Sequence, residues 1–258
     1  FLGILGLVLA VGFFVFYRSP EEHRRLGQEE YEMIQRDRAA VTDSGVKVSW
    51  LGLFKHRQIW GLMAGFFCVI WIWNLFIVFL PLYLQDARHV SIANTGILAA
   101  VPYLVAAVMG LTGGFIMTRY SRRPGVSALT AKRRVMVVAA IAAGVLVCLV
   151  PFISSLGLAM VVLSLAMGSI ATMTSAAWAM PSDIVDTRQV ASAGAIMNFG
   201  GYFGGAFSPL IAGMIADATG SYTPSFVLGG IIAALAAVAY VVLVRKPLGA
   251  GTATKQPA

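Results

Sequence analysis

The sequence predicts an all-α membrane protein, and three observations carry this prediction. Of its 258 residues, 59% are hydrophobic and only 12% are charged, and the mean hydropathy is +0.82. The charge-free runs are long, and each contains a stretch of the about 20 apolar residues that a helix needs to cross a bilayer. All of the 19 Lys and Arg residues except Arg88 fall in alternate connections between these runs. That asymmetry is typical of a polytopic protein, and in lipid its spans must be helices.

The expected spans follow one another along the chain. The first apolar run, residues 1–17, begins without a Met and lacks the basic start and cleavage site of a signal peptide, so we expect a helix truncated at its start. Six more spans are expected within residues 58–245, at 59–84, 95–117, 135–153, 156–180, 191–216 and 226–244. The sequence PFISSLG, with one Pro and two Ser, predicts a tight hairpin between the third and fourth of these.

The distribution of basic residues also predicts orientation. The connections at 18–57, 119–134 and 181–188 lie on the same side as the tail, 246–258, and the Lys/Arg count makes that side cytoplasmic. The net charge of +8 is explained by this topology and by attraction to anionic headgroups, so no nucleic acid partner is expected. Two cysteines, Cys68 and Cys148, fall inside spans and indicate no disulfide framework.

Residues 18–57 form a long charged connection with eight basic and seven acidic residues. Its segment EEHRRLGQEEYEMIQRDRAA has good helix formers, so we predict a partly helical linker, whereas TDSGVKVS at 42–49 is expected to be flexible. One interpretation is a solvated connector. The other is a hinge between two membrane halves, of which this chain contains the second.

Polar residues recur with a period of three helices. The first, fourth and seventh helices are almost purely aliphatic, and the pairs between them carry Asn74, Thr112, Thr172, Thr174, Ser175, Asn198 and Ser208. Such a pattern is expected when each three-helix repeat places two helices near a central cavity and one against lipid.

Several of these polar residues are candidates for binding a ligand. Asn198 is the strongest candidate, because an amide inside the membrane is costly unless it faces a partner helix or a water-filled cavity. Tyr202 shares its helix face, as Asn74 does with Trp71. Thr174 and Trp178, four residues apart, form a third pair on one helix face. These groups suit a polyol or an aromatic acid, although interhelical hydrogen bonds and interfacial aromatics explain them equally well.

The span expected at residues 191–216 is rich in glycine, which indicates both close helix packing and a helix that bends easily. Gly200 and Gly204 are spaced four apart, which lets helices touch backbone to backbone. Pro102 and Pro209 each leave a carbonyl unpaired and mark kinks where a rocking bundle would hinge. Static packing is the alternative interpretation of the glycines.

The interiors of the complete spans contain no Asp, Glu, His, Lys or Arg. They therefore offer neither a proton relay nor a cation for a carboxylate. No Ser, His and Asp set and no metal-ligand spacing occurs within a span, so we expect no enzyme, no cofactor and no metal.

Several motifs resemble one known family. They are YRSPEEHRRL at 17–26, FLPLYL at 79–84, NFGGYFGGAFSPLIAG at 198–213 and TGSY at 219–222. The chain resembles the second half of a twelve-helix protein of the anion:cation symporter branch of the major facilitator superfamily, which includes sugar-acid, hexuronate and phthalate-type permeases. The resemblance implies a C-terminal six-helix bundle preceded by a truncated helix.

The resemblance also implies roles for individual residues. Asn198, Ser175 and Trp178 match positions that contact substrate, with Asn74 and Tyr202 as further candidates. GGFIMTRYSRR at 113–123 resembles the cytoplasmic gating motif, with Thr118 where an Asp is usual. Residues with an expected gating or hinge role are Arg119, Arg122, Arg123, Gly200, Gly204 and Pro209. Ala177 and Phe66 stand where sugar-acid permeases tend to place polar groups, which favours a more apolar or aromatic carboxylate.

The implied function is proton-coupled uptake of a small organic anion by alternating access. The expected partners are the anion, a proton, membrane lipids and an N-terminal six-helix half that carries the coupling groups. A bacterial inner membrane is the expected location, with the C-terminus in the cytoplasm. Two alternatives remain open at this point: a drug or metabolite effluxer of the same superfamily, and a seven-helix receptor.

Overall fold

The computed structural model describes residues 2–17, 27–33, 35 and 50–248. The chain divides into two units, Phe1–Lys47 and Val48–Ala258. The first contains α1, Leu2–Phe16, an apolar helix of 15 residues, and one helical turn at residues 28–33. The segment at 42–49, for which we expect flexibility, and the linker residues 18–26 lie outside the described residues.

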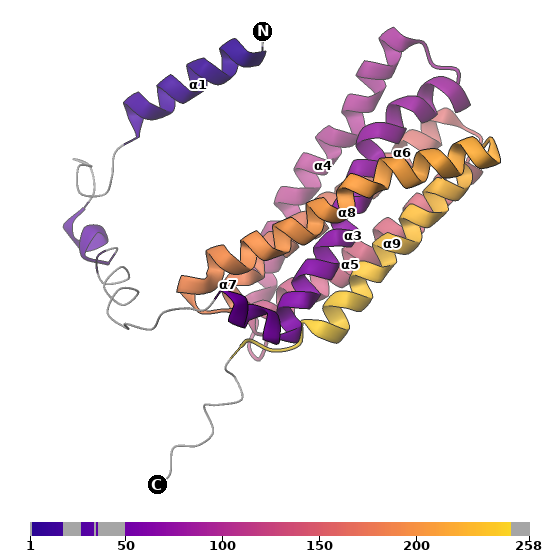
Figure 1. The fold of residues 1–258 in the computed structure, drawn as a ribbon. Coiled ribbons are helices and arrows are strands. Elements are labelled where there is room, and N and C mark those ends of the chain that lie inside the picture. Colours follow the sequence, from indigo (N-terminus) through magenta and orange to yellow (C-terminus); the bar gives the residue numbers. More distant parts are fainter. Residues whose placement is uncertain (1, 18–26, 34, 36–49, 249–258) are drawn as a thin grey trace. The chain divides into compact units, whose positions relative to one another are not determined.

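The second unit is a bundle of six helices, each long and apolar enough to cross a membrane (Figure 1). They are α3 Arg57–Leu82, α4 Ile92–Ser121, α5 Ala128–Leu149, α6 Leu156–Ala179, α8 Val190–Thr219 and α9 Thr223–Leu243. Short elements connect them, namely η1 Leu51–Lys55, η2 Tyr83–Ala87, η3 Val150–Phe152, α7 Pro181–Ile184 and η4 Thr187–Gln189. The all-α membrane fold predicted from the sequence is confirmed.

Three helices extend further than the expected spans because hydropathy detects the apolar part of a helix and not its charged ends. α5 begins at Ala128, where 135 was expected, since the Ser127 side chain accepts a hydrogen bond from the Thr130 backbone and caps the helix. Ser91 caps α4 in the same way. α8 extends to Thr219, and the following residue, Gly220, ends the helix because its φ of 62° lies in the left-handed region.

The helices α3 and α6 are the most buried of the six, and α4 and α8 are the least. α3 packs against α8 and α9, and α6 packs against α4 and α5. The two aliphatic helices α5 and α9 also pack against each other. Glycine allows this contact, because a Cβ on Gly144 would lie 2.8 Å from the Gly230 carbonyl oxygen.

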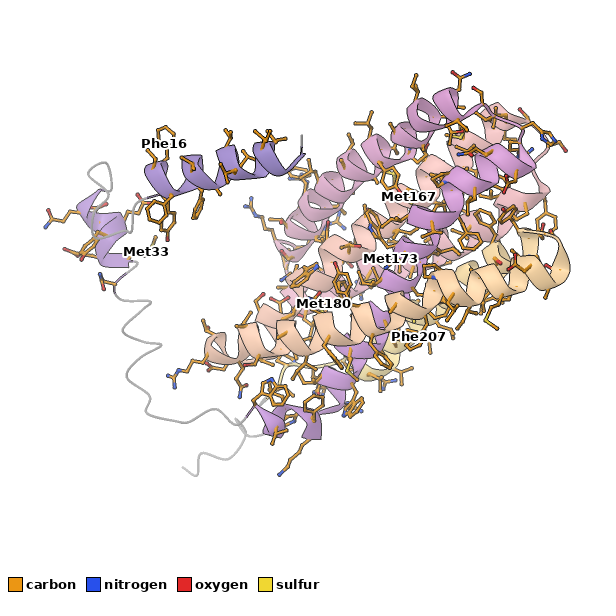
Figure 2. The ribbon with its side chains drawn as sticks, turned by 45° about the horizontal axis from the view of Figure 1, so that its top comes forward. Phe16, Met33, Met167, Met173, Met180 and Phe207 are labelled. Carbon is orange, nitrogen blue, oxygen red and sulfur yellow. The ribbon has the colours of Figure 1, made fainter. Side chains whose placement is uncertain are left out.

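The core is built largely from side chains of α3 and α6, and α6 contributes buried methionines. Met167, Met173 and Met180 are fully buried, and Figure 2 shows them among the packed helices. Phe207 of α8, by contrast, is 42% exposed. Flexible thioether side chains fill the irregular space between helices that cross at different angles.

All described Lys and Arg residues of the bundle except Arg88 gather at one end, which we call the basic end. It contains the first turns of α3, α5 and α8 and the last turns of α4, α6 and α9. Hydrogen bonds to backbone carbonyls hold it together: the Gln58 side chain donates from Nε2 to Lys246 O at 3.2 Å, and the backbone N of Leu248 donates to Ile184 O at 2.7 Å. The opposite end, with Arg88, is called the Arg88 end.

Candidate functional site

The candidate site lies along the contact between α3 and α8. Glycines of α8 leave room for α3 side chains: Gly201 faces Phe66, and Gly205 faces Ile70 and Asn74. A Cβ on Gly205 would lie 2.6 Å from Asn74 Nδ2, so no larger residue fits without a shift. α8 therefore lies directly on α3, and its polar residues are held at fixed positions.

Trp178, near the end of α6, completes one wall of the site. Its ring centroid lies 5.7 Å from that of Phe66 in an edge-to-face arrangement. A Cβ on Gly194 of α8 would lie 3.9 Å from the Trp178 ring. Trp178 is 51% exposed, so one side of its ring is open. Residues from α3, α6 and α8 thus meet at this ring pair.

Asn198 lies on the same face of α8 as Gly194 and Gly201, because residues three and four apart share a helix face. That face is turned toward the pair Phe66 and Trp178. The Asn198 Oδ1 atom is buried and has no hydrogen-bond partner. An unpaired buried acceptor costs about 1–3 kcal/mol, so a hydrogen-bond donor that reached this oxygen would be stabilised here.

The other predicted substrate residues are placed differently. Asn74 Nδ2 donates to Ile70 O at 3.0 Å and adjoins Gly205, two helical turns or about 10 Å along α8 from Asn198. Ser175 Oγ donates to Gly110 O at 3.2 Å, so its hydroxyl joins α6 to α4. Tyr202 is 61% exposed, and the edge-to-face ring pair at the site is formed by Phe66 and Trp178. The structure brings Asn198 and Trp178 together but not Ser175.

An aromatic ladder on α8 was not singled out from the sequence. Phe199, Phe203 and Phe207 are 70%, 57% and 42% exposed, and neighbouring centroids lie 6.2 and 5.3 Å apart. Their spacing of four residues was a detectable signal for one helix face. The ladder gives α8 an apolar surface on the side away from α3.

At the basic end, the expected gating arginines Arg119, Arg122 and Arg123 are exposed at the end of α4. The Arg123 guanidinium lies 5.5 Å from the centroid of the Tyr120 ring. Arg134 of α5 lies 5.8 Å from the same ring and donates a hydrogen bond to the Tyr120 hydroxyl. Tyr120 therefore joins α4 to α5 through its contacts with Arg134, whereas its cation–π contact with Arg123 is local.

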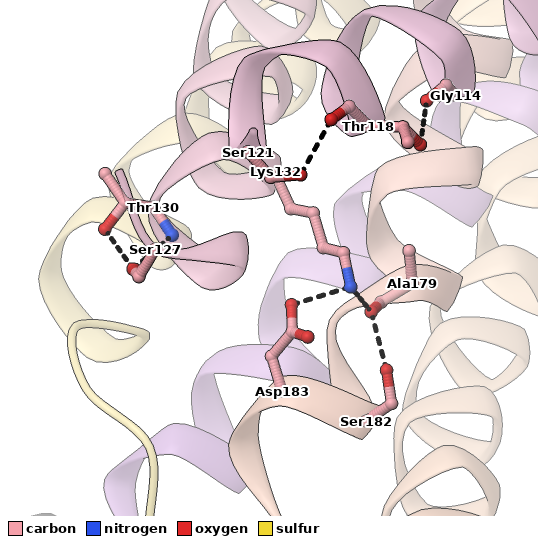
Figure 3. Close-up of polar contacts among 9 residues, drawn as sticks. All are labelled: Gly114, Thr118, Ser121, Ser127, Thr130, Lys132, Ala179, Ser182 and Asp183. Atoms are coloured by element: carbon pink, nitrogen blue, oxygen red, sulfur yellow. Dashed lines mark hydrogen bonds and ion pairs between the residues drawn. The ribbon is translucent and has the colours of Figure 1, made fainter. Parts of the chain in front are cut away.

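The gating motif contains no ion pair at Thr118, whose hydroxyl donates to Gly114 O of its own helix at 3.0 Å (Figure 3). An ion pair lies nearby instead: Lys132 Nζ is 2.7 Å from Asp183 Oδ2 and also donates to Ala179 O at 2.7 Å (Figure 3). This pair joins α5 to the end of α6 and to α7. Sequence reasoning missed it because the two residues are far apart in the chain.

The expected hinge residues are closely packed. Gly200 faces Met63 and Gly204 faces the Phe67 ring, so both allow α8 to approach α3. α8 continues as a helix through Pro209. Ser208, just before it, donates a 2.7 Å hydrogen bond to the Trp71 carbonyl, which crosses from α8 to α3.

A polar cluster closes the Arg88 end. Tyr222 donates a 2.6 Å hydrogen bond to Asp86 Oδ2. That bond, with burial and the charges of Asp86 and Asp217, raises the pKa of Tyr222 from 10.0 to about 12. Arg88 donates to the Tyr83 hydroxyl, to Ser154 O at 2.8 Å and to Ile153 O. The cluster links α3 to both turns at this end.

The fold and site define an integral membrane protein with an unpaired polar group, Asn198 Oδ1, between packed helices. The model of the Major Facilitator Superfamily matches residues 1–131 and 126–258. The chain belongs to the Major Facilitator Superfamily.

Three curated relatives illustrate its similarity to individual proteins. A probable L-galactonate transporter of Escherichia coli is 28% identical over 96% of this chain and 54% of its own length. A hexuronate transporter of Bacillus subtilis is 27% identical over 98% and 59%. A probable sulfoacetate transporter of Cupriavidus necator is 28% identical over 91% and 54%. The chain thus spans about half the length of the curated relatives it matches.

Proposed function

We propose that the chain is the second half of a secondary active transporter that takes up a small organic anion, a sugar acid or an aromatic carboxylate, together with protons. The observation that carries this proposal is the unpaired Asn198 Oδ1, on the face of α8 that is turned toward the rings of Phe66 and Trp178, within helices long enough to cross a membrane. The relatives support the substrate class, since galactonate, hexuronates and sulfoacetate are all small organic anions.

Each group has a chemical role in this proposal. Asn198 accepts a hydrogen bond from a substrate hydroxyl, which gives its unpaired oxygen a donor. The open face of Trp178 stacks on a sugar ring or an aromatic ring. Asn74, about 10 Å further along the helix, lies within reach of the far end of an extended acid through hydrogen bonds of about 2.8 Å.

The charge of the anion needs groups that this chain does not place at the site. Its span interiors have no cation and no titratable acid. We therefore assign carboxylate binding and proton coupling to a preceding six-helix half, joined through residues 18–57. In alternating access the two halves rock about the site. The contacts of Tyr120 with Arg123 and Arg134 at the basic end, and the bond of Tyr222 to Asp86 at the Arg88 end, then form this half's parts of the two gates. Gly200, Gly204 and Pro209 accommodate movement of α8.

The proposed orientation places the basic end and the C-terminus in the cytoplasm of a bacterium, with the bundle in the inner membrane. The distribution of Lys and Arg supports this, because only Arg88 lies at the other end among the described residues of the bundle.

Uptake into proteoliposomes that contain both halves tests the proposal. The panel is labelled galactonate, glucuronate, tartrate, phthalate and hydroxyphenylacetate, with and without an inward proton gradient. Gradient-dependent accumulation of one acid, lost in Asn198→Ala, would support it. The matched control is Ser164→Ala, which removes only a 2.7 Å bond to Met160 O of the same helix.

The alternative is an effluxer of the same superfamily, so a second arm measures expulsion of ethidium. Ethidium transport without uptake of any acid would favour the effluxer. Unchanged uptake in Asn198→Ala would mean that Asn198 serves packing and that the substrate binds elsewhere.

A further inference from the structure

Two grooves flank the first turns of α5 at the basic end. One, of about 600 Å³, lies between α5 and α9 and is lined by Arg133, Arg134, Val137, Val138, Val241 and Arg245. The other, of about 590 Å³, lies between α4 and α5, and its lining includes Tyr120, Arg134 and Val138. Arg134 and Val138 line both. The two grooves are therefore neighbours separated by one helix.

The mouths of the grooves carry positive charge that no lining carboxylate balances. Neither set of lining residues includes an Asp or a Glu. Of the three consecutive cations on α5, Lys132 is turned toward Asp183, whereas Arg133 and Arg134 are turned to the grooves. Successive residues point about 100° apart around a helix, which explains this division.

The arginines are held in place but retain free donors. Arg133 donates to Val244 O at 3.2 Å and to Arg245 O at 3.4 Å through one nitrogen, Nη1. Arg134 is fixed by the hydroxyl and ring of Tyr120. Arg245 donates to Val241 O at 3.2 Å through Nε. A guanidinium has five N–H donors in a planar fork, so each of the three can still bind a phosphate oxygen.

Below the arginines the walls are mostly apolar. The second groove also includes Thr112 of α4 and Ser169 and Thr172 of α6, whose hydroxyls donate to backbone carbonyls of their own helices. Val138 is 68% exposed between the grooves, and Val137 and Val241 line the first of them. Ile116 and Ala142 continue the second groove deeper along α4 and α5. Charge at the mouth with an apolar trough beneath it matches a molecule that has an anionic head and hydrocarbon chains. A free phosphate or a sugar acid would leave the trough uncovered.

We propose that this region binds one anionic phospholipid of the leaflet at the basic end. Its phosphate lies between Arg133, Arg134 and Arg245, and its acyl chains lie in the two grooves on either side of Val138. Basic pockets between membrane helices are suited to anionic headgroups, and each nearby cation contributes about 1 kcal/mol. The lipid would touch Tyr120 and so join α4, α5 and α9. This site does not depend on the identity of the transported substrate.

Native mass spectrometry and thermal unfolding of the purified protein in detergent test the site. The probes are dioleoylphosphatidylglycerol, dioleoylphosphatidylcholine and inorganic phosphate. We expect retention of phosphatidylglycerol and a higher melting temperature than with phosphatidylcholine. In Arg133→Gln/Arg134→Gln, phosphatidylglycerol should bind about 5-fold more weakly for each arginine removed. The control Lys55→Gln/Lys246→Gln removes equal charge at the same end, and both of its lysines are exposed and outside the grooves.

The variant Val138→Trp keeps every charge and fills the space between the grooves, so it too should weaken phosphatidylglycerol binding. It decides the matter if the arginine variant does not fold. Equal retention of both lipids would overturn the proposal. An equal loss in the lysine control would show a diffuse charge effect, and stabilisation by inorganic phosphate alone would show a simple anion site. Either of these results would also overturn it.

Discussion

Tyr222 donates a 2.6 Å hydrogen bond to the carboxylate of Asp86, which joins the end of η2, after α3, to the turn between α8 and α9. The two residues are distant in sequence, and their contact closes the Arg88 end of the bundle. In the transport cycle proposed above, this contact lies within one half and holds the Arg88 end of that half together.

The variant Tyr222→Phe should lower the free energy of unfolding by about 1 kcal/mol, because it removes one hydrogen bond and little apolar surface. The pKa of Tyr222 is raised, so the stability that the bond contributes is fully present below pH 10.0 and is lost as the pH rises toward 12. Thermal unfolding between pH 8 and pH 12 measures this. The loss of unfolding stability at alkaline pH should be smaller in Tyr222→Phe than in the native protein. In Tyr202→Phe it should equal that of the native protein. Equal declines in all three would refute the assignment.

Asn198 offers a test that separates function from packing. In Asn198→Leu the unpaired buried oxygen is removed, so we expect unfolding stability to be retained or increased by about 1 kcal/mol. Uptake of the organic anion should nevertheless be lost. By comparison, Ser208→Ala breaks the 2.7 Å bond to Trp71 O and should cost about 1 kcal/mol of stability. A large loss of stability in Asn198→Leu would instead indicate a structural role for the amide.

Glycine substitutions should destabilise in an order set by what the new methyl group meets. Gly144→Ala and Gly230→Ala meet backbone carbonyl oxygens at 2.8 and 2.6 Å and should each cost about 1–3 kcal/mol. Gly200→Ala meets the Cγ atom of Met63, close to the backbone end of that side chain, so its cost should be similar. Gly213→Ala meets nothing within 4 Å and should be neutral or stabilising by up to about 1 kcal/mol. Melting temperatures give the order, and a reversed order would contradict the α5 and α9 contact.

The ion pair between Lys132 and Asp183 should be measurable by a double-mutant cycle with Lys132→Gln and Asp183→Asn. The side chains are 19% and 17% exposed, so we expect a coupling of about 1–2 kcal/mol, between the values of exposed and buried pairs. Urea unfolding at low and high salt measures it. A coupling near zero would mean that Lys132 acts mainly through its bond to Ala179 O. Lys55→Gln, at an exposed position, is the single-site control.

The candidate site was only partly predictable. Asn198 and Trp178 could be chosen from the sequence because polar and amphipathic groups are rare inside apolar runs. Their meeting through Phe66 depends on the rotation of three helices, which the sequence pattern does not specify. Ser175 illustrates the limit: the family resemblance implied a substrate contact, but its hydroxyl bonds to Gly110 O on the neighbouring helix.

The sequence by itself determined the fold class and the approximate positions of the membrane helices, because apolar length and charge placement are local properties of the chain. It also predicted the family through short motifs. Only the tertiary structure decided which faces meet: that Lys132 turns to Asp183 while Arg133 and Arg134 turn to the grooves, and that Tyr222 reaches Asp86. Those contacts depend on how closely glycine faces such as Gly144 and Gly230 allow helices to pack. The packing distance and rotation of neighbouring helices are collective properties, set by residues far apart in sequence.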